Sequence, residues 1–439
     1  MRSRFIATGA ALVVATALLA GCSGGGGTSS STINTKPAGA GKTLTLWDYE
    51  GDTSAMGIAW KAAITEFEKE TGAKVKFEAK SFEQIQSTAS QVLNSNSAPD
   101  IMEYNKGNAT AGLLSTEGLL TNLDPAVKAY GWDKDLSSSL QTTAKYNAKG
   151  IMGSGSFYGI PNYGEFVMMY YNKDEFDKYG VKVPTTFSEL EDALATFKKA
   201  GITPLSESAV EYPLGQLWYQ LALLHADRGW VNDYQTYAGK VSFHDSDFTF
   251  ATQTVKDWVD KGYISKDATG IKAQDAGDAF QGGSSPMFYS GSWWYGTFTA
   301  GIKNFQWGTF LFPGAKLSPG SSGNLWVVPA KSKNKDLAYK FIDITMSKKI
   351  QNLMGNNGGI PVAAEASAIT DAKSKELIDN FNTLTGQDGL AFYPDWPTPS
   401  FYDQINTALQ KLVNGSETPS AVLDELGSEY ADGVKQITG

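Results

Sequence analysis

Residues 43–102 have the sequence TLTLWDYEGDTSAMGIAWKAAITEFEKETGAKVKFEAKSFEQIQSTASQVLNSNSAPDIM, and this stretch decides the fold class. Its opening residues alternate between polar and apolar side chains, and residues 74–79 do so again, which is typical of strands. Residues 99–102 follow as a third, shorter segment. We therefore expect three strands within about 60 residues.

Two helices are expected between these strands. Residues 54–71 place apolar side chains, among them Trp60 and Phe67, on one helical face, and Gly72 is typical of a helix end. A second helical stretch ends near Asn94. Strands that alternate with helices in this way are typical of an α/β fold with a largely parallel sheet.

The remainder of the chain continues the mixture of strands and helices. Residues 157–171 are dense in aromatic residues and β-formers, and they predict strand structure. Thr186 is followed three residues later by Glu189, the pattern of a capping box at a helix start. Further helices are expected over residues 214–226, over 250–261 and from Thr418 onward. We find no internal repeat.

The N-terminus has the pattern of a bacterial lipoprotein signal. Arg2 and Arg4 precede a mostly apolar stretch over residues 5–20, and the small residues before Cys22 complete the lipobox LAGC. This pattern predicts a signal peptide over residues 1–21, cleavage before Cys22 and lipid attachment to its thiol. The alternative is an uncleaved single-pass anchor with a chance cysteine.

Residues 22–41 are expected to form a flexible linker between lipid and domain. The segment holds four consecutive glycines, a Ser/Thr run and little that is apolar, so it has almost nothing to bury. A flexible chain of this length spans about 25 Å on average. Simple N-terminal disorder is the alternative.

The composition predicts two lobes and an acidic surface. The 439 residues carry a net charge of −9, and removal of the signal peptide changes it to −11 because two arginines and no acid are lost. Such a surface argues against nucleic acid or anionic lipid as a partner. The roughly 400 residues after the linker exceed one hydrophobic core, which favours two lobes or domains.

Few residues are available for metal or catalytic chemistry. Cys22 is the only cysteine, and His225 and His244 are the only histidines, so disulfides, cysteine–zinc sites and cysteine nucleophiles are excluded. We expect neither a metal nor a cofactor. Arg228 is the only arginine beyond the signal peptide, which disfavours anionic ligands. Aromatic residues make up 12% of the chain and suit a neutral ligand rich in hydroxyl groups.

Several segments, in order along the chain, match a known family. The chain resembles extracellular solute-binding protein family 1, the maltose-binding-protein-like sugar receptors of ABC importers. The matching segments are LTLWDYE (in the region 43–50), APDIMEY (98–104), YGIPNYGEFVMMYYNKDEF (158–176), VPTTFSEL (183–190), FQGGSSPMFYSGSWW (280–294), FLFPG (310–314), KSKNKDLAYKFIDITMSKKIQNLM (331–354) and GGIP (358–361).

This resemblance implies an α/β, two-lobed periplasmic-binding-protein-like fold of type II, with the ligand in a cleft between the lobes. The chain would cross between lobes near residues 160–168 and 307–313. The N-terminal lobe would comprise residues 42–160 and 312–355, and the C-terminal lobe residues 161–306 and 356–439.

The ligand site is expected where aromatic side chains stand beside carboxylates and amides. The faces of a sugar ring stack on aromatic rings, and its hydroxyls need hydrogen-bonding partners once water is excluded. The candidate ligand contacts are Glu50, Glu103, Tyr104, Asn105, Tyr163, Glu165, Trp218, Trp293, Trp294, Asn324, Trp326, Tyr393, Asp395, Trp396 and Tyr402.

Other interpretations of some of these residues remain open at this stage. Glu165 could form a salt bridge that stabilises the hinge, and Trp218 on its helix could belong to the core. The sequence does not decide which of Trp293 and Trp294 would face the ligand. Trp47, three residues before Glu50, could be a core residue.

The sequence favours a transport receptor over two other classes of protein. A lipid-anchored glycoside hydrolase would need a carboxylate pair, such as Glu165 with Asp395 or Glu50 with Glu103. An adhesive surface lipoprotein would explain the acidic surface but not the two-lobe landmarks. A polyamine or another cation is a minor alternative ligand.

We therefore expect a monomeric, non-enzymatic lipoprotein on the outer face of the bacterial cell membrane. It would capture a neutral sugar, an oligosaccharide rather than a monosaccharide, and deliver it to a membrane permease driven by a cytoplasmic ATPase. Discrimination among sugars, linkages and chain lengths depends on sub-ångström placement of hydrogen-bonding groups.

Overall fold

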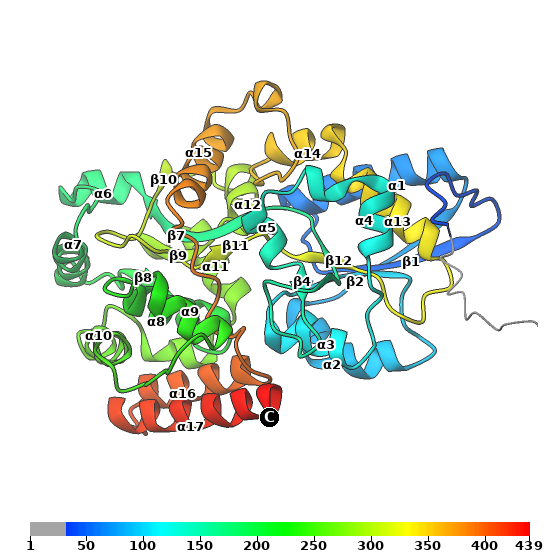
Figure 1. The fold of residues 1–439 in the computed structure, drawn as a ribbon. Coiled ribbons are helices and arrows are strands. Elements are labelled where there is room, and N and C mark those ends of the chain that lie inside the picture. The colour runs from blue at the N-terminus through cyan, green and yellow to red at the C-terminus, as the bar shows by residue number, and fades with distance from the viewer. Residues whose placement is uncertain (1–31) are drawn as a thin grey trace, which may run out of the picture. The chain divides into compact units, whose positions relative to one another are not determined.

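The computed structural model describes residues 32–439, apart from the side chains of residues 138 and 139. The predicted signal peptide, Cys22 and the first part of the predicted linker lie outside the described residues. Residues 34–439 form one compact unit, which contains two five-stranded sheets and the helices around them (Figure 1).

The first sheet has the strand order β2-β1-β3-β12-β6. Its parallel half comes from the segment that decides the fold class, because β1 pairs in parallel with both β2 and β3. β12, from much later in the chain, is antiparallel to β3 and to β6. The strands are β1 (Thr43–Asp48), β2 (Lys74–Ala79), β3 (Ile101–Tyr104), β6 (Ile160–Pro161) and β12 (Leu325–Val327).

Helix α1 (Ala55–Thr71) packs on helices α13 (Lys335–Met346) and α14 (Lys348–Gly355) beside this sheet. Ser54 caps its first turn by accepting from the Gly57 N–H, and Gly72 ends it in the left-handed conformation at φ 73°. The ring centroids of Trp60 and Trp326 lie 5.2 Å apart, and those of Phe67 and Phe341 lie 5.8 Å apart. These buried aromatic contacts fix α1 against β12 of the first sheet and against α13.

The second sheet is built around β7 (Glu165–Asn172), the long strand in the segment expected to be rich in strands. β7 pairs antiparallel with β9, β10 and β11, and β8 is parallel to β9. The remaining strands are β8 (Leu205–Ser206), β9 (Met287–Gly291), β10 (Trp307–Phe310) and β11 (Gly320–Ser321), with β4 (Lys145–Tyr146) and β5 (Ser156–Phe157) as a separate pair.

The chain passes between the sheets at two short segments that lie side by side. It leaves the first sheet after β6 and enters β7 at residues 162–164, and it returns between β11 and β12 at residues 322–324. The Asn162 N–H donates to the Asn324 carbonyl at 3.1 Å. The return lies later than the segment 307–313 that the resemblance implied, because β10 and β11 both pair with β7. The lobe boundaries themselves stay a prediction.

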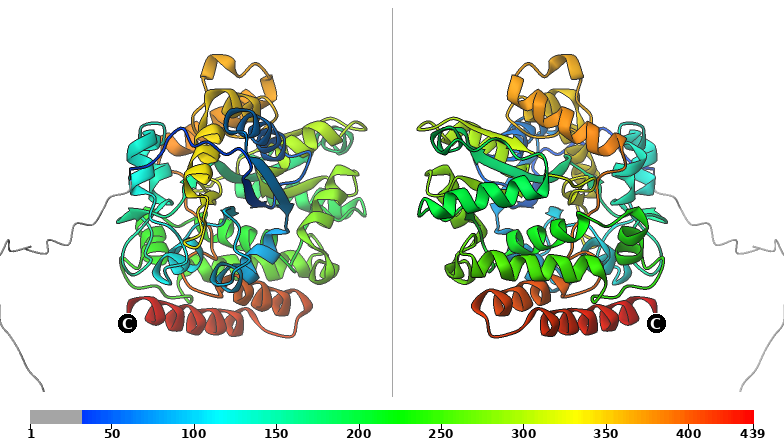
Figure 2. Two further views of the ribbon diagram at one scale, coloured as in Figure 1. Left: turned by 90° about the vertical axis from the view of Figure 1, so that its right-hand side faces the viewer. Right: turned by 90° about the vertical axis from the view of Figure 1, so that its left-hand side faces the viewer.

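Helices cover the second sheet and continue to the C-terminus. Helix α8 (Tyr212–Leu223) packs on β9, on α10 (Ser246–Asp260) and on α16 (Phe401–Asn414). α16 and α17 (Pro419–Thr438) run side by side at the C-terminal end (Figure 2). The capping box at Thr186 and Glu189 is present at the start of α7 (Phe187–Lys199), as predicted.

The other helices are shorter or lie at the periphery of the two sheets. They are α2 (Phe82–Asn94), η1 (Asn108–Gly112), α3 (Leu113–Thr116), α4 (Asp124–Tyr130), η2 (Trp132–Lys134), α5 (Ser138–Thr142), α6 (Lys173–Tyr179), α9 (Arg228–Thr236), η3 (Lys266–Gly270), α11 (Ala273–Gln281), α12 (Trp293–Gly301), η4 (Ala366–Ala368) and α15 (Ala372–Gly386). Over residues 32–439, no helix is both long enough and apolar enough to cross a bilayer.

The predicted flexible linker extends too far at its C-terminal end. Pro37 and Gly39 are buried, and the Gly39 N–H donates to the Thr71 carbonyl at 2.8 Å. A side chain at Gly39 would stand 2.6 Å from the Ala73 Cβ, so only glycine permits this approach. The small residues that suggested flexibility therefore pack residues 37–41 against the end of α1.

Candidate functional site

A cavity of about 550 Å³ lies between the two sheets, at the point where the parallel strands of the first sheet end. Residues that follow β1 and β3 form one wall, and the starts of α8, α11 and α12 contribute to the other. Both segments that pass between the sheets reach it, through Tyr163 and Asn324. Ligands of α/β proteins bind beyond the carboxyl ends of strands, so this is the expected place for a site.

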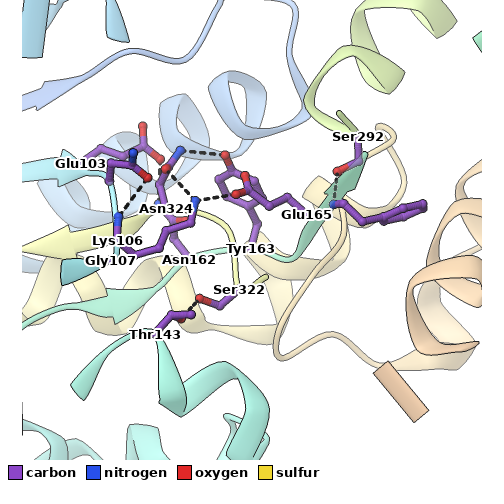
Figure 3. Close-up of polar contacts among 12 residues, drawn as sticks. Glu103, Lys106, Gly107, Thr143, Asn162, Tyr163, Glu165, Ser292, Ser322 and Asn324 are labelled. Atoms are coloured by element: carbon purple, nitrogen blue, oxygen red, sulfur yellow. Dashed lines mark hydrogen bonds and ion pairs between the residues drawn. The ribbon is translucent and has the colours of Figure 1, made fainter. Parts of the chain in front are cut away.

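A buried polar network crosses the floor of the cavity (Figure 3). The Lys106 ammonium donates to Glu165 Oε1 at 2.5 Å and to Asn324 Oδ1 at 3.2 Å. The Asn324 amide then donates to the Tyr163 hydroxyl at 2.8 Å. These four side chains come from three separate parts of the chain, because Tyr163 and Glu165 lie on the stretch that enters β7. The network therefore ties both sheets and both connecting segments together.

Two aromatic rings flank the Lys106 ammonium on the cavity side. It lies 5.5 Å from the ring centroid of Tyr393 and 5.3 Å from that of Trp396, within the range of a cation–π contact. Gly107 makes this packing possible, because a Cβ there would lie 2.6 Å from the Trp396 side chain. Gly107 also has a φ of 111°, which favours glycine.

A cluster of carboxyl groups, with Asp48 and Glu103 buried and Glu50 half-buried, lies at the ends of β1 and β3. Glu50 lines the cavity and accepts from the Ser54 hydroxyl at 3.2 Å, while Asp48 accepts from the Glu50 N–H at 3.2 Å. Burial, and then the nearby Asp48, raise the pKa of Glu50 to about 8. Burial raises the pKa of Asp48 to about 7. Burial and the charge of Glu50 raise the pKa of Glu103 well above its usual range.

The loop of residues 393–396 brings a further carboxylate and two rings into the cavity. Its backbone is held from α9, since the Gln235 amide donates to the Tyr393 carbonyl at 2.8 Å and the Tyr234 hydroxyl donates to the Pro394 carbonyl at 2.5 Å. Burial raises the pKa of Asp395 to about 6. The loop is therefore fixed by hydrogen bonds that leave its side chains to line the cavity.

Both tryptophans at the start of α12 line the cavity, but in different ways. Trp293 is half-buried, and its Nε1–H donates to the Tyr212 hydroxyl at 3.2 Å. Trp294 is only 6% exposed, and its ring stacks on that of Phe298 at 5.3 Å. Trp293 therefore presents the more accessible ring to the cavity, and its contact with a ligand stays a prediction.

Several polar atoms of the lining make no hydrogen bond to any other described residue. They are the Tyr49, Tyr393 and Tyr402 hydroxyls, the side-chain oxygen of Gln216 and the Trp294 Nε1, and each of these atoms is buried. Buried polar groups are normally paired, so unpaired ones at a cavity wall are available to a polar ligand.

Most of the residues predicted from the sequence come together in this cavity. Those that line it are Glu50, Asn105, Tyr163, Glu165, Trp293, Trp294, Asn324, Tyr393, Asp395, Trp396 and Tyr402. Glu165 combines two of the roles considered for it, because it lines the cavity and also forms the ion pair with Lys106.

Four predicted residues lie outside the lining, and each is packed within the protein. Glu103 is fully buried and accepts from the Asn162 amide at 2.8 Å, and Tyr104 is buried beside it at the end of β3. Trp326 packs between Trp60 and Phe341. Trp218 stacks on Phe248 at 5.0 Å and donates to the Thr252 hydroxyl, so it has the core position that was its alternative.

Sequence reasoning missed a comparable number of lining residues. Lys106 directly follows the predicted Asn105, so the end of the same strand could have indicated it. Phe82 and Glu83 lie at the start of α2, and Lys272 and Gln274 lie at the start of α11. Neither helix start carries a local sequence signal for a ligand site. The main residues missed are Tyr49, Phe82, Glu83, Lys106, Glu211, Tyr212, Gln216, Lys272 and Gln274.

Comparison with known proteins places the chain in a family. Residues 50–352 match the family described as bacterial extracellular solute-binding protein. The chain is 28% identical to the diacetylchitobiose binding protein DasA of Streptomyces coelicolor, over 91% of this chain and 89% of that protein. It is 26% identical to a maltooligosaccharide ABC transporter solute-binding lipoprotein of Streptococcus pneumoniae, over 86% of this chain and 85% of that protein.

Solved structures show the same fold. A protein from work on xylan utilization by the thermophilic bacterium Caldanaerobius polysaccharolyticus superposes with a TM-score of 0.78 at 24% identity, over 88% of this chain and 99% of that one. The fold is therefore the two-lobed, type II fold that the sequence predicted. Because the family match covers more than half of its residues, the chain belongs to the bacterial extracellular solute-binding proteins.

Proposed function

We propose that this protein is the substrate receptor of a sugar ABC transporter and captures a neutral oligosaccharide in the cavity between its sheets. The observation that carries the proposal is the lining itself, in which the rings of Trp293, Tyr393 and Trp396 stand beside the carboxylates of Glu165 and Asp395. Rings of this kind stack on sugar faces, and carboxylates accept from sugar hydroxyls.

The charges of the lining support a neutral ligand over an anionic one. Lys106 is already paired with Glu165, which leaves Lys272 as the other lysine of the lining. Glu50, Glu83, Glu211 and Asp395 also line the cavity, so an anionic ligand would meet an excess of carboxyl groups. The relatives named for diacetylchitobiose and for maltooligosaccharides lend support to an oligosaccharide.

The proposal includes a lipid anchor and a membrane partner. The lipobox LAGC predicts that Cys22 is acylated, and the pneumococcal relative is itself named a lipoprotein. The receptor would act as a monomer on the outer face of the cell membrane and deliver the sugar to a permease. Cys22→Ser should move the protein from the membrane fraction to the medium, and its retention on the membrane would contradict the anchor.

A thermal-shift screen of residues 23–439 against mono- and oligosaccharides tests the receptor function. A sugar at a hundred times its Kd should stabilise the protein by about 2.7 kcal/mol, a shift that a melting curve resolves. The sugar should be recovered unchanged after binding. Cleaved sugar would instead indicate a glycoside hydrolase, and no shift with any sugar would contradict a carbohydrate ligand.

A further inference from the structure

Phe82 lies at the edge of the cavity, at the start of α2. It is the first residue of α2, where Ser81 caps the helix by accepting from the Gln84 N–H, and its half-buried ring lines the cavity. The cap fixes the direction in which the helix starts. The ring is thereby held at the boundary between the two sides of the cavity.

The Phe82 ring makes contacts with both sides. It lies 5.4 Å from the ring of Tyr49, which follows β1 of the first sheet. It lies 6.4 Å from the ring of Tyr212, which begins α8, and 6.2 Å from that of Tyr402 on α16. Because α8 and α16 pack with the second sheet, one ring joins the two sides here.

Polar interactions do not reinforce this aromatic junction. Glu83, the next residue, lies near Lys272 and Glu211, and burial raises its pKa. Within residues 32–439, however, no ion pair joins Glu83 to Lys272. The cavity floor is different, because there the buried ion pair of Lys106 and Glu165 joins the sides. The two ends of the cavity are therefore held by different chemistry.

We propose that Phe82 is a gate residue whose ring must leave Tyr212 and Tyr402 before a sugar can enter or leave the cavity. The proposal rests on the proposed function and assigns Phe82 to the rate of ligand exchange. The polar floor around Lys106 and Glu165 selects the sugar, whereas the aromatic junction sets how long it stays. Loss of the two ring contacts across the cavity should accelerate release about tenfold.

The variant Phe82→Ala tests this assignment, with Phe77→Ala as its matched control. Phe77 belongs to the same side of the molecule, on β2, and is 40% exposed and absent from the cavity lining. Stopped-flow tryptophan fluorescence with the sugar from the screen should show release about tenfold faster for Phe82→Ala and unchanged for Phe77→Ala. Phe82→Trp, which keeps a ring, should restore slow release. A release rate for Phe82→Ala within twofold of the unaltered protein would overturn the gate.

A second measurement needs no sugar, so the gate can fail or hold independently of the receptor function. Cys22 is the only cysteine, so a protein of residues 23–439 has none of its own. Ser87→Cys on α2 and Asp275→Cys on α11 then introduce two exposed cysteines, and each is modified with a spin label. Phe82→Ala should lengthen or broaden the distance distribution between the labels, and Phe77→Ala should leave it unchanged. An unchanged distribution in Phe82→Ala would overturn the gate, even if no sugar were found to bind.

Discussion

The ammonium of Lys106 and the carboxylate of Glu165 form an ion pair of 2.5 Å between the two sheets, with side chains that are 3% and 5% exposed. Lys106 follows β3 of the first sheet, and Glu165 begins β7 of the second. Two charges that are both removed from water depend on each other, because either one alone would be buried without a partner.

Replacement of Lys106 by Met should destabilise the protein strongly, by about 3–5 kcal/mol, because Glu165 is left buried and unpaired. Lys272→Met, at an exposed cavity lysine, should change stability by less than about 0.5 kcal/mol. Urea unfolding measures both. The double variant Lys106→Met with Glu165→Gln should recover part of the loss, and a double variant less stable than Lys106→Met would refute the pairing argument.

The two tryptophans of α12 should respond differently to truncation. Trp294→Ala removes a ring that is 6% exposed and should cost about 3–5 kcal/mol of stability. Trp293→Ala removes a half-buried ring of the cavity and should weaken sugar binding while it costs less stability. Melting curves and titration calorimetry on both variants separate the effects. Equal sugar affinity in Trp293→Ala and the unaltered protein would exclude that ring from the ligand site.

Stability should fall as the pH rises from about 4 to about 8. The folded-state pKa of Glu50 is raised to about 8 and that of Asp48 to about 7, so in this window the folded state binds more protons than the unfolded state. For such groups the free energy of unfolding decreases with rising pH, by an amount on the order of a few kcal/mol. The urea midpoints of unfolding at pH 5 and pH 7.5 measure this decrease in stability.

Glu50→Gln should flatten this pH dependence, since the amide does not titrate. Asp52→Asn is the matched control, because Asp52 is an exposed neighbour paired with Lys61. The control should retain the slope of the unaltered protein. A Glu50→Gln variant with the full slope would show that Glu50 titrates normally.

Gly107→Ala should be markedly more harmful than Gly118→Ala. Both glycines have positive φ, 111° and 69°, but a Cβ at Gly107 would lie 2.6 Å from Trp396, whereas Gly118 has nothing within 4 Å. Gly118→Ala should therefore cost only the backbone strain, about 1 kcal/mol, and Gly107→Ala more than that. Equal unfolding midpoints for the two variants would contradict the contact with Trp396.

The sequence was most informative where local chemistry alone determines structure. The alternation in residues 43–47 and the glycine stop at Gly72 predicted β1 and the end of α1. The capping pair of Thr186 and Glu189 predicted the start of α7. In these places the residues that form the element are adjacent in the chain, so periodicity and capping suffice.

The sequence was least informative where distant segments meet. Trp218 and Trp326 have the same chemistry as Trp293, and only the packing of Phe248 and Trp60 against them shows that they belong to the core. The lining residues of α2 and α11 carried no local signal, because their position depends on the arrangement of the two sheets. Lys106 shows the intermediate case, since its strand end was recognised but its pairing with Glu165 was not.

The loop of residues 393–396 is synthesised after all the strands of both sheets. Every strand of both sheets has been synthesised once residue 327 is complete, whereas Tyr393, Asp395, Trp396 and Tyr402 are among the last residues made. A nascent or C-terminally clipped chain can therefore hold all of its strands and still lack one wall of the cavity. A complete cavity lining therefore requires a chain that extends at least to Tyr402.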